Sequence, residues 1–340
     1  MNVGLRASFT SRVRVFGGFL LFGLQSSTLA ATFSYFPWGA QGIVRCSGEG
    51  TVTFMDVEGR AKWSEVYPLR GPTYSMAVSP TGSYAAICAR EYLSIIDPSG
   101  KVRASKNKKG AHFWGANWID EASLVIATDS AVICCKTDGE EKWSASCRIP
   151  IGFPLLAHEG LVFAATTDAS LLCLDAKTGE RRWQSKLDSF LRGISINGSA
   201  LVLNSLRGTL YKMDLDGAIL KKLPIGDGTN VFVPLTKMVG GKFSIHSPGG
   251  ELYIFSGDLE ILHRWNIGRV PMQPAVSVRE GCTVYCLGPK LLRVYDDAGG
   301  GAQNIEMESP IESFCKRDEN SLWVGLTDGT CVPCKLNDAQ

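Results

Sequence analysis

The chain has 340 residues, of which 45% are hydrophobic, and a formal net charge of +2. This much apolar side chain can bury a sizeable core, which excludes a largely disordered protein. The first thirty residues carry three arginines and no acid, so the rest of the chain holds 32 basic and 33 acidic side chains. A body so close to neutral is not that of a nucleic-acid binder, which needs a sustained basic face.

Residues 1–30 have the order of a secretory signal peptide. Three arginines precede an apolar run over residues 15–24, and small residues follow at Thr28 and Ala30. Ten apolar residues are short for a membrane span. We therefore expect cleavage near Ala30, a periplasmic or cell-envelope location, no integral membrane span after signal removal, and a single domain over residues 31–340. The alternative is an N-terminal membrane anchor.

An internal repeat organises the rest of the chain, and its clearest copy runs from Gly160 to Trp183. Two short apolar strands flank the turn at residues 167–169, the second strand ends at Asp175, and a turn containing Gly179 leads to a third strand that Trp183 opens. Another strand precedes the copy at residues 153–157. Each copy is therefore predicted to be a four-stranded antiparallel meander.

The repeat recurs eight times. Its aligned positions are residues 56, 97, 136, 175, 214, 256, 296 and 335, with spacings of 41, 39, 39, 39, 42, 40 and 39. A four-stranded sheet that is apolar on both faces can bury both of these faces only when neighbouring sheets pack against it in a closed ring. The sequence predicts an all-β fold, a β-propeller of eight four-stranded blades, with seven blades as the alternative. The recurring Trp63, Trp143, Trp183 and Trp265 are interpreted as wedges between blades, each with its indole N–H on a neighbouring carbonyl.

The alignment also predicts how the ring closes. Residues 33–38 fall opposite the innermost strand of a later copy, so we expect them to pair with residues 43–46 in the first blade. The last blade then holds three strands and lacks an outer one. Pro333 favours this arrangement, because proline is tolerated mainly at a free strand edge. In the competing arrangement, residues 32–36 form the outer strand of the last blade.

The phrase Leu171-Leu-Cys-Leu-Asp-Ala-Lys-Thr-Gly-Glu-Arg-Arg-Trp183 resembles the pyrroloquinoline-quinone (PQQ) repeat. Proteins with this repeat include quinoprotein alcohol dehydrogenases and the outer-membrane assembly lipoprotein of the bacterial β-barrel machinery. The resemblance covers most of residues 42–340, and the copies that end at Trp63, Trp143 and Trp183 match best. Residues 77–87 look more like a WD-repeat phrase. Resemblance in fold does not by itself deliver a function.

The sequence supplies no catalytic constellation, and we expect no cofactor and no metal site. The adjacent Cys134 and Cys135 imitate a pair found beside the cofactor in quinoprotein dehydrogenases, but they fall within a strand and should point to opposite faces. Cys331 and Cys334 have redox or metal-binding spacing, which Cys315 could complete, yet they also lie in a predicted strand. Four scattered histidines lack metal-ligand spacing.

The segment from Lys106 to Trp118 is the candidate partner-binding site, because it interleaves cations with aromatic side chains. Its candidate residues are Lys106, Lys108, Lys109, His112, Phe113, Trp114 and Trp118. In the competing interpretation, Trp114 and Trp118 pack inside an inner strand while the lysines only solvate a turn.

Two functions from different classes remain. The first is a non-catalytic exported scaffold, a monomer within a complex, that binds other envelope proteins or extended peptides, with a role in outer-membrane protein assembly implied by the resemblance. The alternative is a propeller that binds a small ligand or acts as a quinone-dependent oxidoreductase. The short length and the missing acidic ligand clusters favour the scaffold.

Overall fold

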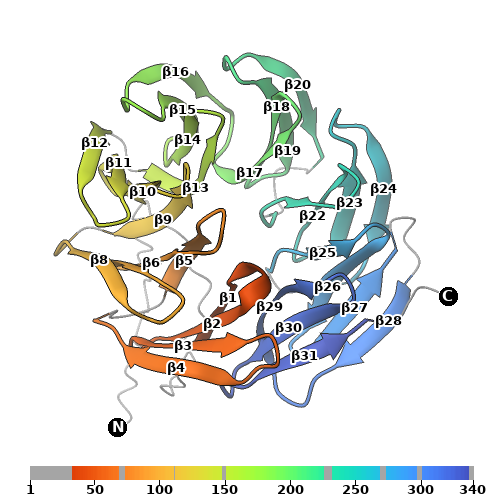
Figure 1. The fold of residues 1–340 in the computed structure, drawn as a ribbon. Coiled ribbons are helices and arrows are strands. Elements are labelled where there is room, and N and C mark those ends of the chain that lie inside the picture. Colours follow the sequence, from red (N-terminus) through yellow and green to blue (C-terminus); the bar gives the residue numbers. More distant parts are fainter. Residues whose placement is uncertain are drawn as a thin grey trace, which may run out of the picture. The chain divides into compact units, whose positions relative to one another are not determined.

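The computed structural model describes residues 33–68, 73–110, 112–147, 151–225, 232–268, 273–296 and 301–336. The predicted signal peptide, residues 1–30, lies outside them. The described residues form eight antiparallel sheets arranged as the blades of a ring (Figure 1). The prediction of an eight-bladed all-β propeller is therefore confirmed, and the seven-bladed alternative is wrong. Within the described part of the chain, no helix has the length and apolarity needed to cross a membrane.

In each blade the strands follow one another from the ring centre outward. Blade 1 is β1 (Phe33–Pro37), β2 (Gly42–Ser47), β3 (Thr51–Asp56) and β4 (Ala61–Val66). Blade 2 is β5 (Thr73–Val78), β6 (Ala85–Ala89), β7 (Tyr92–Ile96) and β8 (Val102–Asn107). Blade 3 is β9 (Phe113–Trp118), β10 (Ser123–Thr128), β11 (Ala131–Lys136) and β12 (Glu141–Ser146). Blade 4 is β13 (Ile151–His158), β14 (Leu161–Thr166), β15 (Ser170–Asp175) and β16 (Arg181–Lys186).

The second half of the ring repeats this order until the last blade. Blade 5 is β17 (Leu191–Asn197), β18 (Ala200–Ser205), β19 (Thr209–Asp214) and β20 (Ile219–Pro224). Blade 6 is β21 (Thr236–Lys237), β22 (Phe243–His246), β23 (Glu251–Phe255) and β24 (Ile261–Asn266). Blade 7 is β25 (Val276–Arg279), β26 (Cys282–Gly288), β27 (Leu291–Tyr295) and β28 (Gly301–Glu306). Blade 8 is β29 (Ile311–Asp318), β30 (Ser321–Leu326) and β31 (Cys331–Lys335).

The recurring aspartate holds the turn between the third and fourth strands of a blade. In blade 4, Asp175 Oδ1 accepts hydrogen bonds from the backbone N–H groups of Lys177 and Thr178 at 2.8 and 3.0 Å. Its second oxygen accepts from the Arg182 guanidinium at 2.6 Å. These bonds, that of Arg182 above all, lower the pKa of Asp175 to about 2. The short carboxylate thus fixes the tight turn that the repeat needs.

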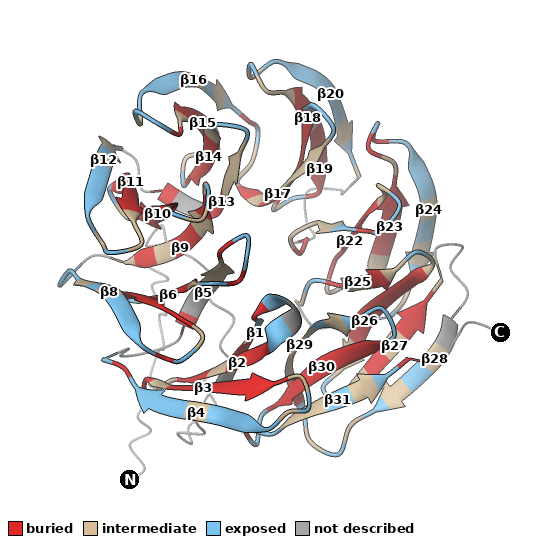
Figure 2. Ribbon diagram, in the orientation of Figure 1, coloured by how far each residue is buried: buried red, intermediate tan, exposed pale blue. Residues whose placement is uncertain are grey.

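The core of the ring lies between neighbouring blades. Every residue of β10 and of β18 is buried, whereas alternate residues of outer strands such as β12 and β16 are exposed (Figure 2). Alternate residues of one strand face opposite neighbours: Cys134 packs in the cluster shared with blade 4, and Cys135 in the cluster shared with blade 2. The two cysteines therefore fill strand positions on opposite faces, as predicted.

Three of the four tryptophans interpreted as wedges make the predicted bond to the next blade. The indole Nε1 of Trp63 donates to Pro98 O at 2.7 Å, that of Trp143 to Ala176 O at 3.0 Å and that of Trp183 to Leu215 O at 2.8 Å. The fourth, Trp265, packs in the cluster that joins blades 6 and 7. The indole rings of Trp63, Trp143 and Trp183 each lie on a glycine in the turn whose carbonyl accepts the indole hydrogen bond. A Cβ at that glycine would lie within about 3 Å of the indole. The glycines are Gly100, Gly179 and Gly217.

The ring closes as the alignment predicts. β1 pairs with β2 from Phe33 opposite Ser47 to Pro37 opposite Ile43, and the last sheet has three strands. Among the described residues the first and last blades share no sheet, and side chains join them. Tyr35 donates to Leu326 O at 3.2 Å and to Thr330 O at 3.1 Å. Figure 1 shows β1 and β29 side by side where the two ends of the ring meet.

Candidate functional site

The candidate segment passes from the outer strand of blade 2 to the inner strand of blade 3. Lys106 lies in β8, with its Nζ 3.7 Å from Glu141 Oε2 of the neighbouring blade. Lys108 and Lys109 are exposed in the turn that follows. Glu91 anchors that turn, because its backbone carbonyl accepts from Lys108 N at 3.0 Å and its Oε1 accepts from Gly110 N at 2.9 Å. Lys108 and Lys109 therefore lie on an ordered turn, and Lys106 lies in the strand that precedes it.

Asp129 organises the start of β9. Its Oδ2 accepts from the backbone N–H of His112 at 2.8 Å and lies 2.9 Å from the ring Nδ1 of the same residue. Its Oδ1 accepts from Trp114 Nε1 at 2.7 Å. The imidazole and the indole also lie against each other, with ring centroids 4.9 Å apart. One carboxylate thus fixes the orientation of both aromatic rings.

Arg90 extends this arrangement into blade 2, because its Nε donates to His112 Nε2 at 3.2 Å. An Nε2 that accepts must be unprotonated, so Nδ1 carries the hydrogen and donates it to Asp129. The histidine side chain is 29% exposed and that of Asp129 is 34% exposed. The arrangement thus holds a guanidinium, an imidazole and an indole in fixed positions. We name Arg90, His112, Trp114 and Asp129 the β9 cluster.

The other two aromatic residues of the segment are part of the core. Phe113 is 2% exposed and Trp118 is 7% exposed, and both pack between blades 2 and 3. Trp118 Nε1 donates to Ala77 O at 2.9 Å, and its ring stacks on Tyr84. The segment therefore divides into the buried Phe113 and Trp118 and the half-buried His112 and Trp114. The Trp114 ring also packs against the core between blades 3 and 4. Sequence reasoning missed Arg90 and Asp129, because both sit in ordinary turns.

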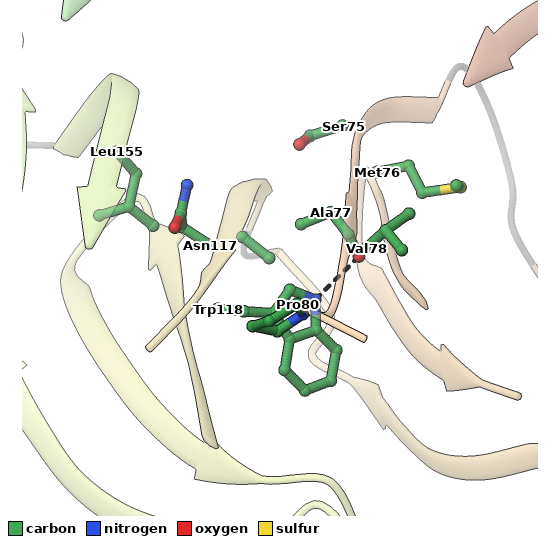
Figure 3. Close-up of a pocket in the computed structure, with 9 residues that line it drawn as sticks. Ser75, Met76, Ala77, Val78, Pro80, Asn117, Trp118 and Leu155 are labelled. Carbon is green, nitrogen blue, oxygen red and sulfur yellow. Dashed lines mark hydrogen bonds between the residues drawn. The ribbon is translucent and has the colours of Figure 1, made fainter. Parts of the chain in front are cut away.

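A cavity of about 420 Å³ opens beside the same strand. It lies where the inner strands β5, β9 and β13 of three successive blades approach one another, and its wall includes Ser75, Met76, Asn117, Trp118 and Leu155 (Figure 3). The dashed line in Figure 3 marks the bond from Trp118 to Ala77, which joins two of the walls. The side-chain oxygen Oδ1 of Asn117 accepts a hydrogen bond from the backbone N–H of Ala157 at 3.4 Å. The accessible lining of the cavity is about equally polar and apolar.

The geometry separates one thiol of the candidate redox or metal site, that of Cys334, from the other two. Cys315 and Cys331 pack with Tyr35 and Trp323 on the face of blade 8 that meets blade 1. Cys334 packs on the opposite face, and its Sγ lies 3.9 Å from Met307 Sδ of blade 7. Burial raises the pKa of Cys331 to about 12, which keeps this thiol protonated and a poor nucleophile at neutral pH. No group of three or more metal-ligating side chains is found in the residues that the structure describes.

These features define a class: the chain is a β-propeller with PQQ-like repeats, similar to the outer-membrane protein assembly factor BamB. Residues 115–258 match the family described as outer membrane protein assembly factor BamB. BamB of Burkholderia pseudomallei is 23% identical over 111 residues, which are 30% of this chain and 29% of that protein. The matched sequence is therefore less than a third of either chain.

Solved structures agree with the fold. BamB of Moraxella catarrhalis superposes with a TM-score of 0.72 at 15% identity, covering 89% of this chain and 96% of that one. The computationally designed Ika8 protein gives 0.75 at 12% identity, with 90% and 97% covered. Sqt1 of Saccharomyces cerevisiae gives 0.73 at 10% identity, with 91% and 100% covered. Propellers of natural and designed origin thus share this architecture, and at these identities the likeness is one of fold alone.

Proposed function

We propose that this chain is an exported, non-catalytic scaffold of the cell envelope that binds other envelope proteins during outer-membrane protein assembly. The β9 cluster carries the proposal, because it presents cationic and aromatic groups in a fixed arrangement beside the exposed lysines of blade 2. Side chains whose orientation is fixed in advance lose little entropy on binding. The likeness to BamB supports the envelope setting.

The structure also supports a scaffold over a quinone-dependent enzyme. The cysteine pair that imitates a cofactor contact is split between two inter-blade cores. Burial raises the pKa of both Cys134 and Cys135 to about 11. Neither thiol therefore reaches a common surface on which a flat cofactor could rest.

The proposal is tested by capture of partners from the envelope fraction. In the variant with Lys108→Ala, Lys109→Ala and Trp114→Ala, we expect recovery of partners to fall at least about tenfold, because removal of two cations and one aromatic anchor takes away a typical hot spot. Quantitative mass spectrometry of cross-linked complexes measures this loss. A matched control replaces Lys221 and Lys222 on the exposed outer strand of blade 5 by alanine, and should leave capture unchanged. Equal recovery with both variants would rule out Lys108, Lys109 and Trp114 as the binding site.

Export gives a separate prediction. Since Thr28 and Ala30 are small residues three and one positions before the expected cut, the mature protein should begin at or close to Ala31. N-terminal sequencing of protein from the envelope fraction measures this. A chain that still begins at Met1 in that fraction would instead support the membrane-anchored alternative.

A further inference from the structure

Among the residues that the structure describes, blade 8 has no outer strand, so the strand position beside β31 is unoccupied. The third strands of complete blades are largely buried, as in β7 and β11. The corresponding β31 is only half-buried, with Pro333 and Lys335 exposed. Unlike the free outer edges of the other blades, β31 is recessed, because the outer strands of the blades on either side, β28 and β4, extend one strand further from the ring centre (Figure 1).

The hydrogen-bonding direction of β31 follows from its contacts with β30. Leu326 N donates to Thr330 O at 2.9 Å, and Leu336 N donates to Asn320 O at 2.8 Å. The even-numbered residues of β31 therefore face β30, and the odd-numbered residues face outward. Within the described part of the chain, no strand pairs with this outer edge. It offers the N–H groups of Cys331 and Lys335, together with three carbonyls.

Blade 1 has two backbone carbonyls whose counterparts in other blades accept hydrogen bonds from the outer strand of the preceding blade. The outer strand of blade 4 donates through Trp183 to Leu215 O and through Ser185 to Gly217 O, the first and third residues after Asp214. The matching carbonyls in blade 1 are those of Val57 and Gly59, after Asp56. Among the described residues, no donor is seen at either carbonyl.

The Trp323 side chain occupies part of the space beside β31. The Trp323 ring reaches across from β30, so a Cβ at Gly59 would lie 3.4 Å from its edge. Trp323 thus covers the glycine that an outer-strand tryptophan covers in other blades. A strand that enters here must carry a small side chain where Trp63, Trp143 and Trp183 stand in their own blades.

We propose that blade 8 binds an extended peptide strand antiparallel to β31, with a serine in the position of Ser185 that donates to Gly59 O and a small side chain two residues earlier, in the position of Trp183. This inference rests on the proposed scaffold function and names the chemistry of one class of partner. Pairing along a sheet edge supplies main-chain bonds, and the alternate side chains supply selectivity. Pro333 faces the edge and withholds one N–H, which weakens the pairing and makes it readily reversible.

The test uses two labelled peptides based on the outer strand of blade 4, residues 180–186, one with its native sequence and one with Trp183→Ser. Fluorescence anisotropy with the whole mature protein should show tighter binding of the serine peptide, because the tryptophan collides with Trp323. In a Trp323→Ala protein the preference should reverse. Equal affinity of both peptides for both proteins would overturn the proposal.

Edge variants test the main-chain pairing without changing the core. Pro333→Ala restores a donor and should tighten binding of the serine peptide about fivefold, the value of one net hydrogen bond. Lys335→Pro removes a donor and should weaken it by a similar factor, whereas Lys335→Ala should not. If Lys335→Pro and Lys335→Ala bind alike, the edge is not the site. Partner capture through the β9 cluster is scored separately, so it can succeed when peptide binding fails.

Discussion

Trp183→Ala should lower the free energy of unfolding by about 3 kcal/mol, the usual cost of truncating a large packed aromatic side chain. Its ring packs against Phe163 and the core between blades 4 and 5, and its indole bond to Leu215 O joins the two blades. Trp183→Phe keeps most of the packing and loses the bond, so about 1 kcal/mol is expected for it. Equilibrium denaturation in urea measures both changes. Neutral surface substitutions change the free energy of unfolding by up to about 0.5 kcal/mol. A change no larger than this for Trp183→Ala would contradict the interpretation of Trp183 as a wedge between blades.

The glycine under this wedge supplies a matched control. Gly217 has φ +93°, and a Cβ there would lie 2.7 Å from the Trp183 ring. Gly198 has φ +59°, and a Cβ there would meet nothing within 4 Å. Both alanine substitutions carry the cost of a left-handed backbone, but only Gly217→Ala also displaces the indole. Gly217→Ala should therefore be the more destabilising of the two, and the difference measures the wedge contact.

Gly325→Ala should destabilise the ring by about 3 kcal/mol, at the upper end for overpacking. A Cβ at Gly325 would lie 2.3 to 2.5 Å from three atoms of the Tyr35 ring, at the contact that closes the ring. Gly288→Ala is the control, since its Cβ would meet only Leu291 Cβ at 3.9 Å. Thermal and urea unfolding measure the two variants side by side.

A double-mutant cycle assigns the cost of Gly325→Ala to the closure contact. In a Tyr35→Ala background the clash is absent, so adding Gly325→Ala should cost less than about 1 kcal/mol. If Gly325→Ala costs the same with and without the Tyr35 ring, its effect arises elsewhere in blade 8. The cycle thereby tests whether side-chain packing joins the first and last blades, in place of a shared sheet.

The repeat made the architecture readable from sequence. Eight aligned positions at a pitch near 40 residues fix the number of blades, because each meander must bury both faces against neighbours. The aspartates, and the tryptophans that follow the aligned positions by 7 to 9 residues, are local signals. Asp175 closes a turn a few residues away, and Trp183 bonds the equivalent turn one repeat later. Even the three-stranded last blade followed from counting strands and from Pro333.

The candidate site was only partly readable. The sequence placed His112 and Trp114 in one exposed segment with Phe113 and Trp118, although the latter two are buried. The alternation of a strand decides which side chains enter the core, but the face that meets a neighbour depends on the packing of blades 2 and 3. Arg90 and Asp129 lie 22 and 17 residues from His112 and reach it only because two turns meet at one end of the ring.

The sequence by itself determined the blade count, the strand order and the point of closure, because these follow from local periodicity repeated along the chain. Only the tertiary structure decided which cation and aromatic rings share the β9 cluster, and that Trp323 reaches Gly59 of blade 1. Each of these depends on how two blades pack face to face. That packing is set by side-chain shape across the interface, which a repeat pattern does not encode.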